Sequence, residues 1–466
     1  MAKASQKGAS ARKPASAKAH GSALAKAPAD LTATEAAAAI ANGELTSEAL
    51  VSACLDRIVA LEPEVKAWAF IDPAYALAQA RDADAIRRAG TGVGPLHGVP
   101  VGIKDVIDTG DMPTQAGSAL FGQYRPRQDS SCVAALRAAG AVIMGKTVTT
   151  ELASSTPGAT RNPRNLAHTP GGSSSGSAAA VACGMVPLAL GTQTAGSVIR
   201  PASFCGIYGF KPTLGLISRH GVLLQSHTLD TIGVYGRTVE DVALAADALG
   251  RHDPQDPVSL GGARPHLLEI ARNEPPLPPL FAFVKTPAWE QTSPVLREAF
   301  EELVAELGAR VEEVEIPSLA RATEAQRIVQ SAENAAYYGV FRERKPELLS
   351  DGMTERLKAG ARIAAQDYIR AVNMREPTYQ SIETLLSQYS ALLTPASLGT
   401  APKGLGSTGD PVMNGVWTFL GVPAVTLPLL EADGLPIGVQ LIGARRDDGR
   451  LLRTARWLAR HLAGEV

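Results

Sequence analysis

Lys104 lies where a charged side chain is costly. It is embedded in residues 99–107 (VPVGIKDVI), an apolar run typical of a strand, and a charged ammonium in such surroundings loses its hydration. On the run alone, a lysine that extends to water from the edge of a sheet explains the pattern better. If the side chain is instead buried, desolvation lowers its pKa below the usual value of about 10.4. A neutral amine of this kind can act as a base.

Ser197 has the surroundings of a nucleophile. It lies in residues 191–201 (GTQTAGSVIRP), where small neighbours leave its hydroxyl approachable. They also let successive backbone N–H groups point at one position, and such a nest can bind an oxyanion. An ordinary Gly/Ser turn is the simpler alternative.

Ser174 fits a second nucleophile pattern, GxSxG, over residues 172–176. In esterases this serine sits on a sharp turn directly after a buried strand. Residues 161–170 (RNPRNLAHTP) have the composition of a loop instead. A flexible linker over residues 171–177 is also disfavoured, because the apolar stretch 178–190 follows at once and predicts a buried helix.

Residues 140–147 (GAVIMGKT) match the phosphate-loop pattern GxxxxGK[ST]. In a phosphate loop the strand precedes the first glycine, and the middle residues turn their N–H groups toward phosphate. Here a predicted helix, 131–139, precedes Gly140, and the middle residues are themselves an apolar strand. A nucleotide site is therefore the weakest of the alternatives.

These side chains lie in a segment that alternates strands with helices. Between residues 94 and 236, short β-branched runs such as 99–106 and 141–144 are separated by clusters of Gly, Pro, Ser and Thr and by helical pieces. This alternation predicts an α/β sheet. Before it, Thr32 and Glu35 have the spacing of a capping box, which opens the first of two amphipathic helices.

Strands return after a long interruption. Residues 251–279 are rich in proline and predict a surface connection. We then expect a strand at 280–284, a helix with Ser293 as N-cap, and a mostly helical stretch at about 318–388. Apolar runs at 391–393, 423–430 and 437–442 and a helix from about Asp447 complete the chain. Strands on both sides of the helical stretch predict one large sheet.

Composition narrows the class of protein. The 466 residues carry a formal charge of −1, which argues against nucleic-acid binding through a basic field. Residues 1–29 hold six Lys and Arg and no acid. This Ala/Ser/Lys tail lacks apolar periodicity, so we expect it to be disordered, with a transit peptide or a nucleic-acid arm as the alternative.

No run of residues is apolar enough to span a membrane, and no spacing of His or Cys residues suggests a metal site. Four scattered cysteines predict buried free thiols in a cytoplasmic protein. They are Cys54, Cys132, Cys183 and Cys205.

Four segments together resemble the amidase signature family. They are residues 98–105 (GVPVGIKD), 170–177 (PGGSSSGS), 191–201 and 206–213 (GIYGFKPT). The match is dense over about 94–240 and returns more weakly at 421–423 and 435–443. The resemblance implies an α/β fold with one large mixed sheet covered by helices on both faces, in an amidase domain spanning residues 30–466.

The resemblance also implies a Ser-Ser-Lys triad for hydrolysis of a carboxylic amide through an acyl-enzyme. The nucleophile falls on Ser197, the bridging serine on Ser173, after a cis peptide bond to Gly172, and the base on Lys104. Backbone N–H groups at Thr194, Ala195, Gly196 and Ser197 would form the oxyanion hole, and Gln193 and Ser174 would support the site. Neither a metal nor an organic cofactor is implied. The expected partner is a small-molecule amide, without nucleic acid or membrane, and a homodimer stays open.

The sequence departs from the family at the nucleophile turn. Where the family usually has Asp-x-Gly-Gly-Ser-[Ile/Val]-Arg, this chain has Gln193, Ala195 and an arginine, Arg200, that comes one residue late. Those positions shape the turn, so they affect its supporting contacts before they affect the triad. The family also contains A-type subunits of tRNA-dependent amidotransferases, which act only with partner subunits. That function is the alternative, although the stretch 318–388 does not look like the corresponding part of such subunits.

Overall fold

The computed structural model describes residues 26–154, 156–263 and 266–465. Its centre is an 11-stranded sheet in the order β1-β3-β2-β4-β6-β5-β10-β11-β9-β7-β8. Strand β2 runs parallel to its neighbours β3 and β4, and β7 runs parallel to β8 and β9. The other pairs are antiparallel. The strands are β1 (Trp68–Ile71), β2 (Pro100–Lys104), β3 (Val142–Thr147), β4 (Leu188–Gln193), β5 (Tyr208–Lys211), β6 (Thr231–Gly236), β7 (Phe281–Phe283), β8 (Val311–Glu313), β9 (Ala391–Pro395), β10 (Ala424–Ala432) and β11 (Leu435–Ile442).

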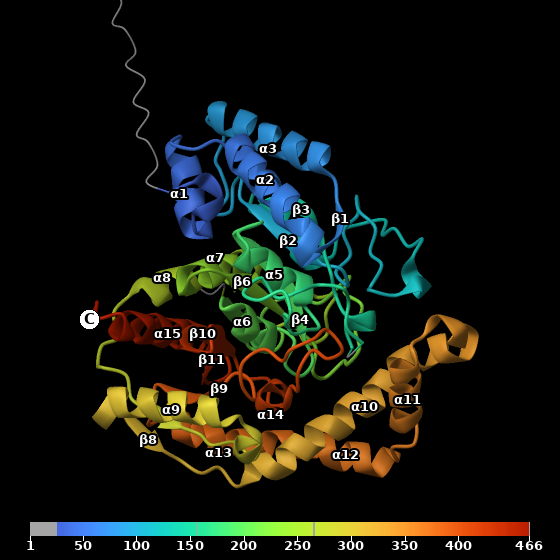
Figure 1. The fold of residues 1–466 in the computed structure, drawn as a ribbon, viewed down its shortest axis with the longest axis vertical. Coiled ribbons are helices and arrows are strands. Elements are labelled where there is room, and N and C mark those ends of the chain that lie inside the picture. Colours follow the sequence, from blue (N-terminus) through green and yellow to red (C-terminus); the bar gives the residue numbers. More distant parts are fainter. Residues whose placement is uncertain (1–25, 155, 264–265, 466) are drawn as a thin grey trace, which may run out of the picture.

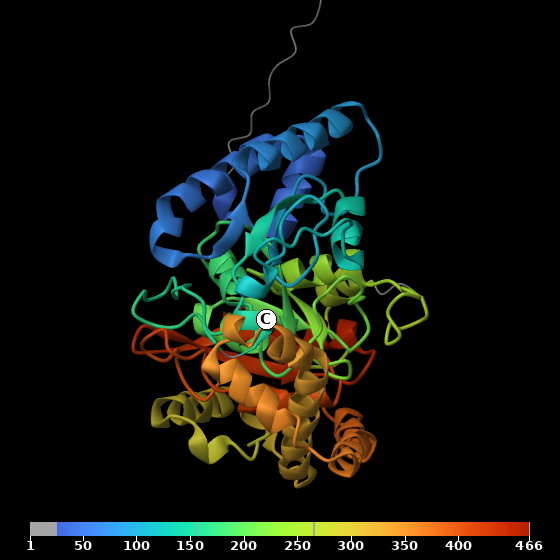
Figure 2. The ribbon, with the colours of Figure 1, turned by 90° about the vertical axis from the view of Figure 1, so that its right-hand side faces the viewer.

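Helices cover both faces of this sheet (Figures 1 and 2). The α-helices are α1 (Ala33–Asn42), α2 (Ser47–Val65), α3 (Pro73–Arg88), α4 (Ser131–Ala138), α5 (Ser175–Ala182), α6 (Ile199–Cys205), α7 (Val239–Leu249), α8 (Leu267–Arg272), α9 (Pro294–Leu307), α10 (Ser318–Arg344), α11 (Asp351–Gly360), α12 (Ala365–Asn373), α13 (Arg375–Leu386), α14 (Val412–Phe419) and α15 (Asp448–Leu462). The expected α/β fold, with one large mixed sheet between helices, is confirmed.

Alternate strand residues enter different cores, because successive side chains point to opposite faces. Val101, Ile103 and Leu190 join the core beneath α4, α7, α8, α9 and α15. On the opposite face, α2, α3, α5 and α6 pack over one end of the sheet and α10, α13 and α14 over the other. Figure 1 shows α1–α3 at one end of the molecule and α9–α13 at the other. Lys104, one residue after Ile103, faces the side covered by α5 and α6.

The N-terminal helix begins as the sequence predicts. Thr32 and Glu35 form a complete capping box at α1. Residues 1–25 of the expected tail lie outside the described residues. Its last part belongs to the folded body, because Ala29 is buried and its carbonyl accepts a hydrogen bond of 2.9 Å from Arg237. The boundary expected at residue 29 was therefore placed too late.

The helix expected over residues 178–190 was wrong at its C-terminal end. Helix α5 stops at Ala182, and strand β4 occupies Leu188–Gln193. Gly184, at a φ of +71°, and Pro187 separate the two elements. The proline-rich segment 251–279 also holds more structure than expected, because α8 lies within it and buries Leu267 and Ala271.

The strands and helices expected in the second half are confirmed. Helix α9 has Ser293 as its N-cap and Pro294 at its first position. Helices α10–α13 occupy most of residues 318–388, and β9, β10, β11 and α15 follow. Strand β10 pairs with β5, so the last quarter of the chain completes the sheet beside the segment that carries the candidate residues.

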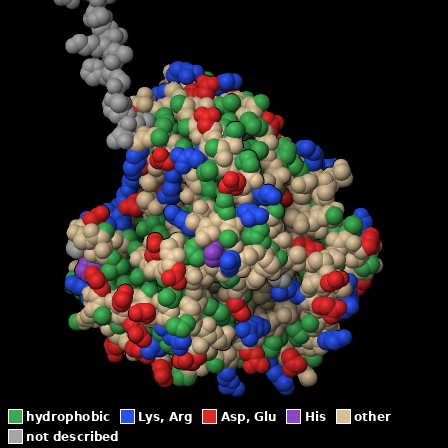
Figure 3. Space-filling model, viewed as in Figure 1, with side chains coloured by type: hydrophobic (Ala, Val, Ile, Leu, Met, Phe, Trp, Pro, Cys, Tyr) green, Lys and Arg blue, Asp and Glu red, His purple; other side chains and the backbone are tan. Residues whose placement is uncertain are grey.

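The surface and the cysteines agree with the composition. Figure 3 shows Lys and Arg side chains intermixed with Asp and Glu over the visible face. The four cysteines are free and buried, as expected, and burial raises the pKa of Cys132 to about 11. Within the described ranges, no helix is both long and apolar enough to cross a lipid bilayer.

Candidate active site

Lys104 ends an interior strand and is completely buried. Strand β2 lies between β3 and β4, so the explanation by a lysine at a sheet edge was wrong. Its Nζ lies 2.7 Å from Ser173 Oγ and 2.8 Å from Thr192 Oγ1. No carboxylate among the described residues lies within ion-pair distance of this amine. Burial consequently lowers the pKa of Lys104 to about 7, against a smaller opposing effect of the Asp230 charge.

Two other lysines are equally buried but have different partners. Lys146 lies in β3, where it forms an ion pair of 3.3 Å with Asp105 and donates to Thr114 Oγ1 at 2.6 Å. Burial lowers the pKa of Lys211 to about 7 as well, yet among the described residues its Nζ donates only to the carbonyls of Pro212 and Val422. Lys104 is thus the one of these three that combines a lowered pKa with a serine hydroxyl.

The position of Lys146 also removes the phosphate-loop interpretation. Helix α4 ends before Gly140, which has a φ of +85°, and the following residues form β3. Three of the four middle residues, 142–144, therefore belong to strand β3 and offer no loop to a phosphate.

Ser173 is fixed from both sides. Its peptide bond to Gly172 is cis, as the resemblance implies. The Gly172 carbonyl accepts a hydrogen bond of 2.7 Å from Arg200 Nη2, and the Ser173 carbonyl accepts one of 3.2 Å from the Thr150 amide. Arg200, displaced by one residue relative to the family pattern, is buried and also donates to the Thr408 carbonyl at 2.8 Å. It therefore joins the helix after the nucleophile turn to the loop that carries Ser173.

Ser197 lies in the turn between β4 and α6 and is 9% exposed. Its carbonyl accepts a hydrogen bond of 3.0 Å from the Tyr235 hydroxyl, which anchors the backbone of the turn. Within the described part of the chain, its side-chain hydroxyl makes no hydrogen bond to Ser173, and no acceptor binds the backbone N–H groups of Ala195, Gly196 and Ser197. The turn thus presents donors and a hydroxyl that are not used internally.

Gln193 braces this turn. Its Oε1 accepts hydrogen bonds from the amides of Val198 at 2.8 Å and Ile199 at 3.0 Å. Its Nε2 donates to Thr418 Oγ1 at 2.9 Å, and Thr418 in turn donates to the Ala195 carbonyl at 2.6 Å. One amide side chain therefore holds the residues on both sides of Ser197.

The Ser174 side chain packs against the backbone of Thr192. It is fully buried, and its Oγ lies 3.2 Å from both the amide and the carbonyl of Thr192. Among the described residues no strand leads directly into it, so the strand that an esterase turn requires is not in place. By fixing Thr192, Ser174 also fixes a hydroxyl that contacts Lys104.

Sequence reasoning singled out neither Thr192 nor Asp230. The Thr192 hydroxyl contacts Lys104, and Asp230 Oδ1 accepts a hydrogen bond of 2.5 Å from Thr194 Oγ1. A carboxylate placed directly before the apolar strand 231–236 was the available signal for Asp230, since a charge at such a place is costly without partners. No comparable local signal marks Thr192.

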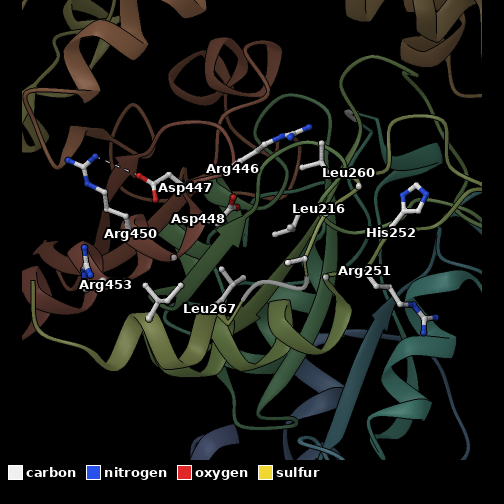
Figure 4. A pocket seen from close by; sticks show the side chains of 16 residues that line it. Leu216, Arg251, His252, Leu260, Leu267, Arg446, Asp447, Asp448, Arg450 and Arg453 are labelled. Carbon is white, nitrogen blue, oxygen red and sulfur yellow. Dashed lines mark ion pairs between the residues drawn. The ribbon is translucent and has the colours of Figure 1, made fainter.

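A cavity of about 710 Å³ lies elsewhere, on the face covered by α7, α8 and α15. Leu216, Leu260 and Leu267 line it, and Arg251 and Arg450 extend outward from its rim in Figure 4. None of the candidate residues lines this cavity. Across the described residues, no group of three His, Cys, Asp or Glu side chains is placed to hold a metal ion.

The chain has relatives of known class along almost its whole length. It matches the amidase family model over residues 49–452. It is 36% identical to the A-type subunit of glutamyl-tRNA(Gln) amidotransferase from Chloroflexus aggregans, over 91% of this chain and 94% of that protein. The peptide amidase from Stenotrophomonas maltophilia superimposes with a TM-score of 0.80 at 30% identity, covering 93% of this chain and 97% of that one.

Another solved structure, described as an unexpected vestigial protein complex that reveals the origins of an s-triazine catabolic enzyme, superimposes with a TM-score of 0.87. Its identity is 28%, over 92% of this chain and 98% of that one. A family match over most of the chain, together with relatives covered almost end to end, identifies the protein class. The chain belongs to the amidase signature family of enzymes, hydrolases that act on carbon–nitrogen bonds.

Proposed function

We propose that this chain hydrolyses a carboxylic amide, with Ser197 as nucleophile, Ser173 as bridging group and Lys104 as base. The observation that carries the proposal is the 2.7 Å separation of Lys104 Nζ and Ser173 Oγ, between two side chains that are at most 1% exposed. A buried amine without an ion pair is largely neutral near pH 8, so it can accept a proton. Unused backbone donors beside Ser197 support the same chemistry.

The proposed reaction uses this contact as a proton relay. Neutral Lys104 takes the proton of Ser173, and Ser173 takes that of Ser197 as Ser197 Oγ bonds to the amide carbon. The relay needs the Ser197 hydroxyl to close on Ser173 when substrate binds, and catalytic hydrogen bonds commonly tighten at that stage.

The turn around Ser197 would stabilise the oxyanion. Backbone N–H groups at Thr194, Ala195, Gly196 and Ser197 are proposed to donate to it. The relay then returns the proton to the leaving nitrogen as the carbon–nitrogen bond breaks. Water attacks the resulting ester of Ser197 and releases the carboxylic acid.

Covalent labelling tests this assignment. A fluorophosphonate should modify Ser197 in the purified chain, identified by mass spectrometry of the labelled peptide, and S197A should neither label nor turn over simple amides. A label found on Ser174 would instead support the esterase interpretation. Simple amides, aryl amides and urea-like compounds, screened with the same preparation, would define the substrate class.

A second candidate keeps the chemistry but changes its setting. This chain is 36% identical, over 91% of its length, to the A-type subunit of an amidotransferase. That similarity favours a subunit that releases ammonia from an amide within a complex. In that case the chain alone should be nearly inactive toward amides, and activity should appear only with partner subunits and tRNA. Hydrolysis by the purified chain at an ordinary enzymatic rate favours the stand-alone amidase.

A further inference from the structure

The loop before β6 forms hydrogen bonds both with the nucleophile turn and with the helical segment α10–α13. This connecting turn comprises residues 225–230 (QSHTLD). Its backbone is closed by a hydrogen bond of 3.2 Å from the Asp230 amide to the Ser226 carbonyl. Two carboxylates, Asp230 within the turn and Glu333 on α10, accept hydrogen bonds from it.

Asp230 faces the nucleophile turn. Its Oδ1 accepts from Thr194 Oγ1 at 2.5 Å, and its Oδ2 accepts from the amides of Gln225 at 2.7 Å and Ser226 at 3.1 Å. The residue is 5% exposed. Because Thr194 carries one of the proposed oxyanion donors on its own backbone, this carboxylate fixes the direction of that N–H group.

Glu333 holds the other side of the connecting turn. Its carboxylate accepts hydrogen bonds from the Ser226 hydroxyl, from the Thr228 amide at 3.1 Å and from the Thr228 hydroxyl at 2.9 Å. Asn334, the next residue on α10, donates to the Gln225 carbonyl at 3.0 Å. Tyr368 on α12 donates to Glu333 at 2.7 Å, and Arg375 on α13 donates to the Thr228 carbonyl at 2.7 Å. Three helices of the segment are thereby joined to one turn.

Few charges surround Asp230. Arg219 donates to its backbone carbonyl at 3.1 Å, and this guanidinium forms an ion pair with Asp256. Lys104 also senses the Asp230 charge. Burial raises the pKa of the Tyr337 and Tyr338 phenols on α10, and the Asp230 charge adds a smaller contribution in the same direction. Burial raises the pKa of Asp230 itself to about 6, so the carboxylate is ionised when Lys104 is neutral.

We propose that Asp230 is a positioning residue for the oxyanion turn, and that Glu333 keeps Asp230 in place from the helical segment α10–α13. The inference rests on the proposed function and adds to it two residues that do not touch the reacting atoms. It also gives the helical segment a part in catalysis: its attachment at Glu333 determines how well Thr194 is held.

The first test compares D230N with D241N. Asp241 is a matched control, because it is also buried and also accepts one threonine hydroxyl, at 3.0 Å, and two backbone amides, at 2.9 and 3.1 Å. We expect D230N to lower kcat about 10- to 100-fold with little change in KM, since a loosened donor matters mainly in the transition state. The melting temperature of D241N should fall by about as much as that of D230N, while the kcat of D241N should stay within about twofold of the wild-type value.

The pH profile gives a second readout. Removing the Asp230 charge lowers the pKa of Lys104, so the acid limb of kcat/KM should move to lower pH in D230N and stay in place in D241N. T194S should keep most of the activity and T194V should behave like D230N in kcat, because only serine retains the hydroxyl. These two variants keep the test valid if D230N fails to fold.

A double-mutant cycle tests the part of Glu333. E333Q should lower kcat, and its effect should be largely absent in the D230N background, because both changes loosen the same donor. Additive effects, or a D230N loss no larger than that of D241N, would overturn the proposal. Fluorophosphonate labelling of the wild-type chain separates the proposed function from the positioning role. If Ser197 is not labelled, the proposed function fails. If Ser197 is labelled and D230N keeps its kcat, only the positioning role of Asp230 is refuted.

Discussion

Replacing Lys104 with methionine removes the proposed base while filling its space with a flexible unbranched side chain. The burial of Lys104 lowers its pKa to about 7. At pH 8 such an amine is about 90% neutral, against about 0.3% for a lysine of pKa ~10.5, so burial raises the neutral fraction about 300-fold. This factor is what the buried strand end contributes to the availability of the base.

Steady-state kinetics between pH 5 and 9 can measure it. Since protonated Lys104 cannot accept the serine proton, wild-type kcat/KM should fall about tenfold per pH unit below pH ~7 and level off above it. K104M should lose about 10²- to 10⁴-fold in kcat, the usual contribution of a general base, and should lose this acid limb.

K211M is the matched control. Lys211 is also fully buried with a pKa lowered to about 7, but its partners are backbone carbonyls. Folded K211M should therefore keep its acid limb and most of its kcat, with any loss appearing in melting temperature. The reasoning is refuted if folded K104M retains more than a tenth of wild-type kcat/KM, or if K211M loses activity to the same extent.

Three further predictions concern the surroundings of the site. Q193A leaves two amides without their acceptor, so we expect the free energy of unfolding, measured with urea, to fall by about 1–3 kcal/mol. We also expect kcat to fall by a larger factor than KM rises. An unchanged kcat in folded Q193A contradicts the bracing role. S174A should keep fluorophosphonate labelling at Ser197, at a reduced rate because Thr192 is less well held, and lost labelling would place Ser174 in the chemistry itself. Deletion of residues 1–25 should leave melting temperature and kcat/KM unchanged, whereas deletion of residues 1–30 should lower the melting temperature because it removes the Ala29 contact and the ion pair of Asp30 with Arg57.

The sequence was most informative where local pattern and structure coincide. The capping box at Thr32, the N-cap at Ser293 and the apolar runs of β10 and β11 are properties of a few neighbouring residues, and all were predictable. Strand β4 was not, because its first residues, 188–190, continue an apolar stretch whose periodicity does not separate helix from strand. Its pairing with β2 and β6 decides the matter, and both partners are distant in sequence.

In the candidate site, too, features set by neighbouring residues were predictable and features set by distant residues were not. The place of Lys104 inside the sheet depends on the strand order, which residues 99–107 alone do not reveal. Those residues alone favoured a lysine at a sheet edge. The roles expected for Ser173 and Ser197 came from resemblance to a family rather than from spacing. Contacts such as Thr418 with the Ala195 carbonyl or Asp230 with Thr194 join segments that fold together only in three dimensions, and no local pattern announces them.

The pairing of β5 with β10 also has a consequence for synthesis on the ribosome. All three proposed reacting side chains have been translated by residue 197, before the midpoint of the chain. Strand β10 and Thr418, which complete the sheet and brace the turn around Ser197, belong to the last part to emerge. A nascent chain therefore carries the lysine and both serines before it has the strand and the threonine that orient them, so under the proposed mechanism amide cleavage must wait until these later segments have been made.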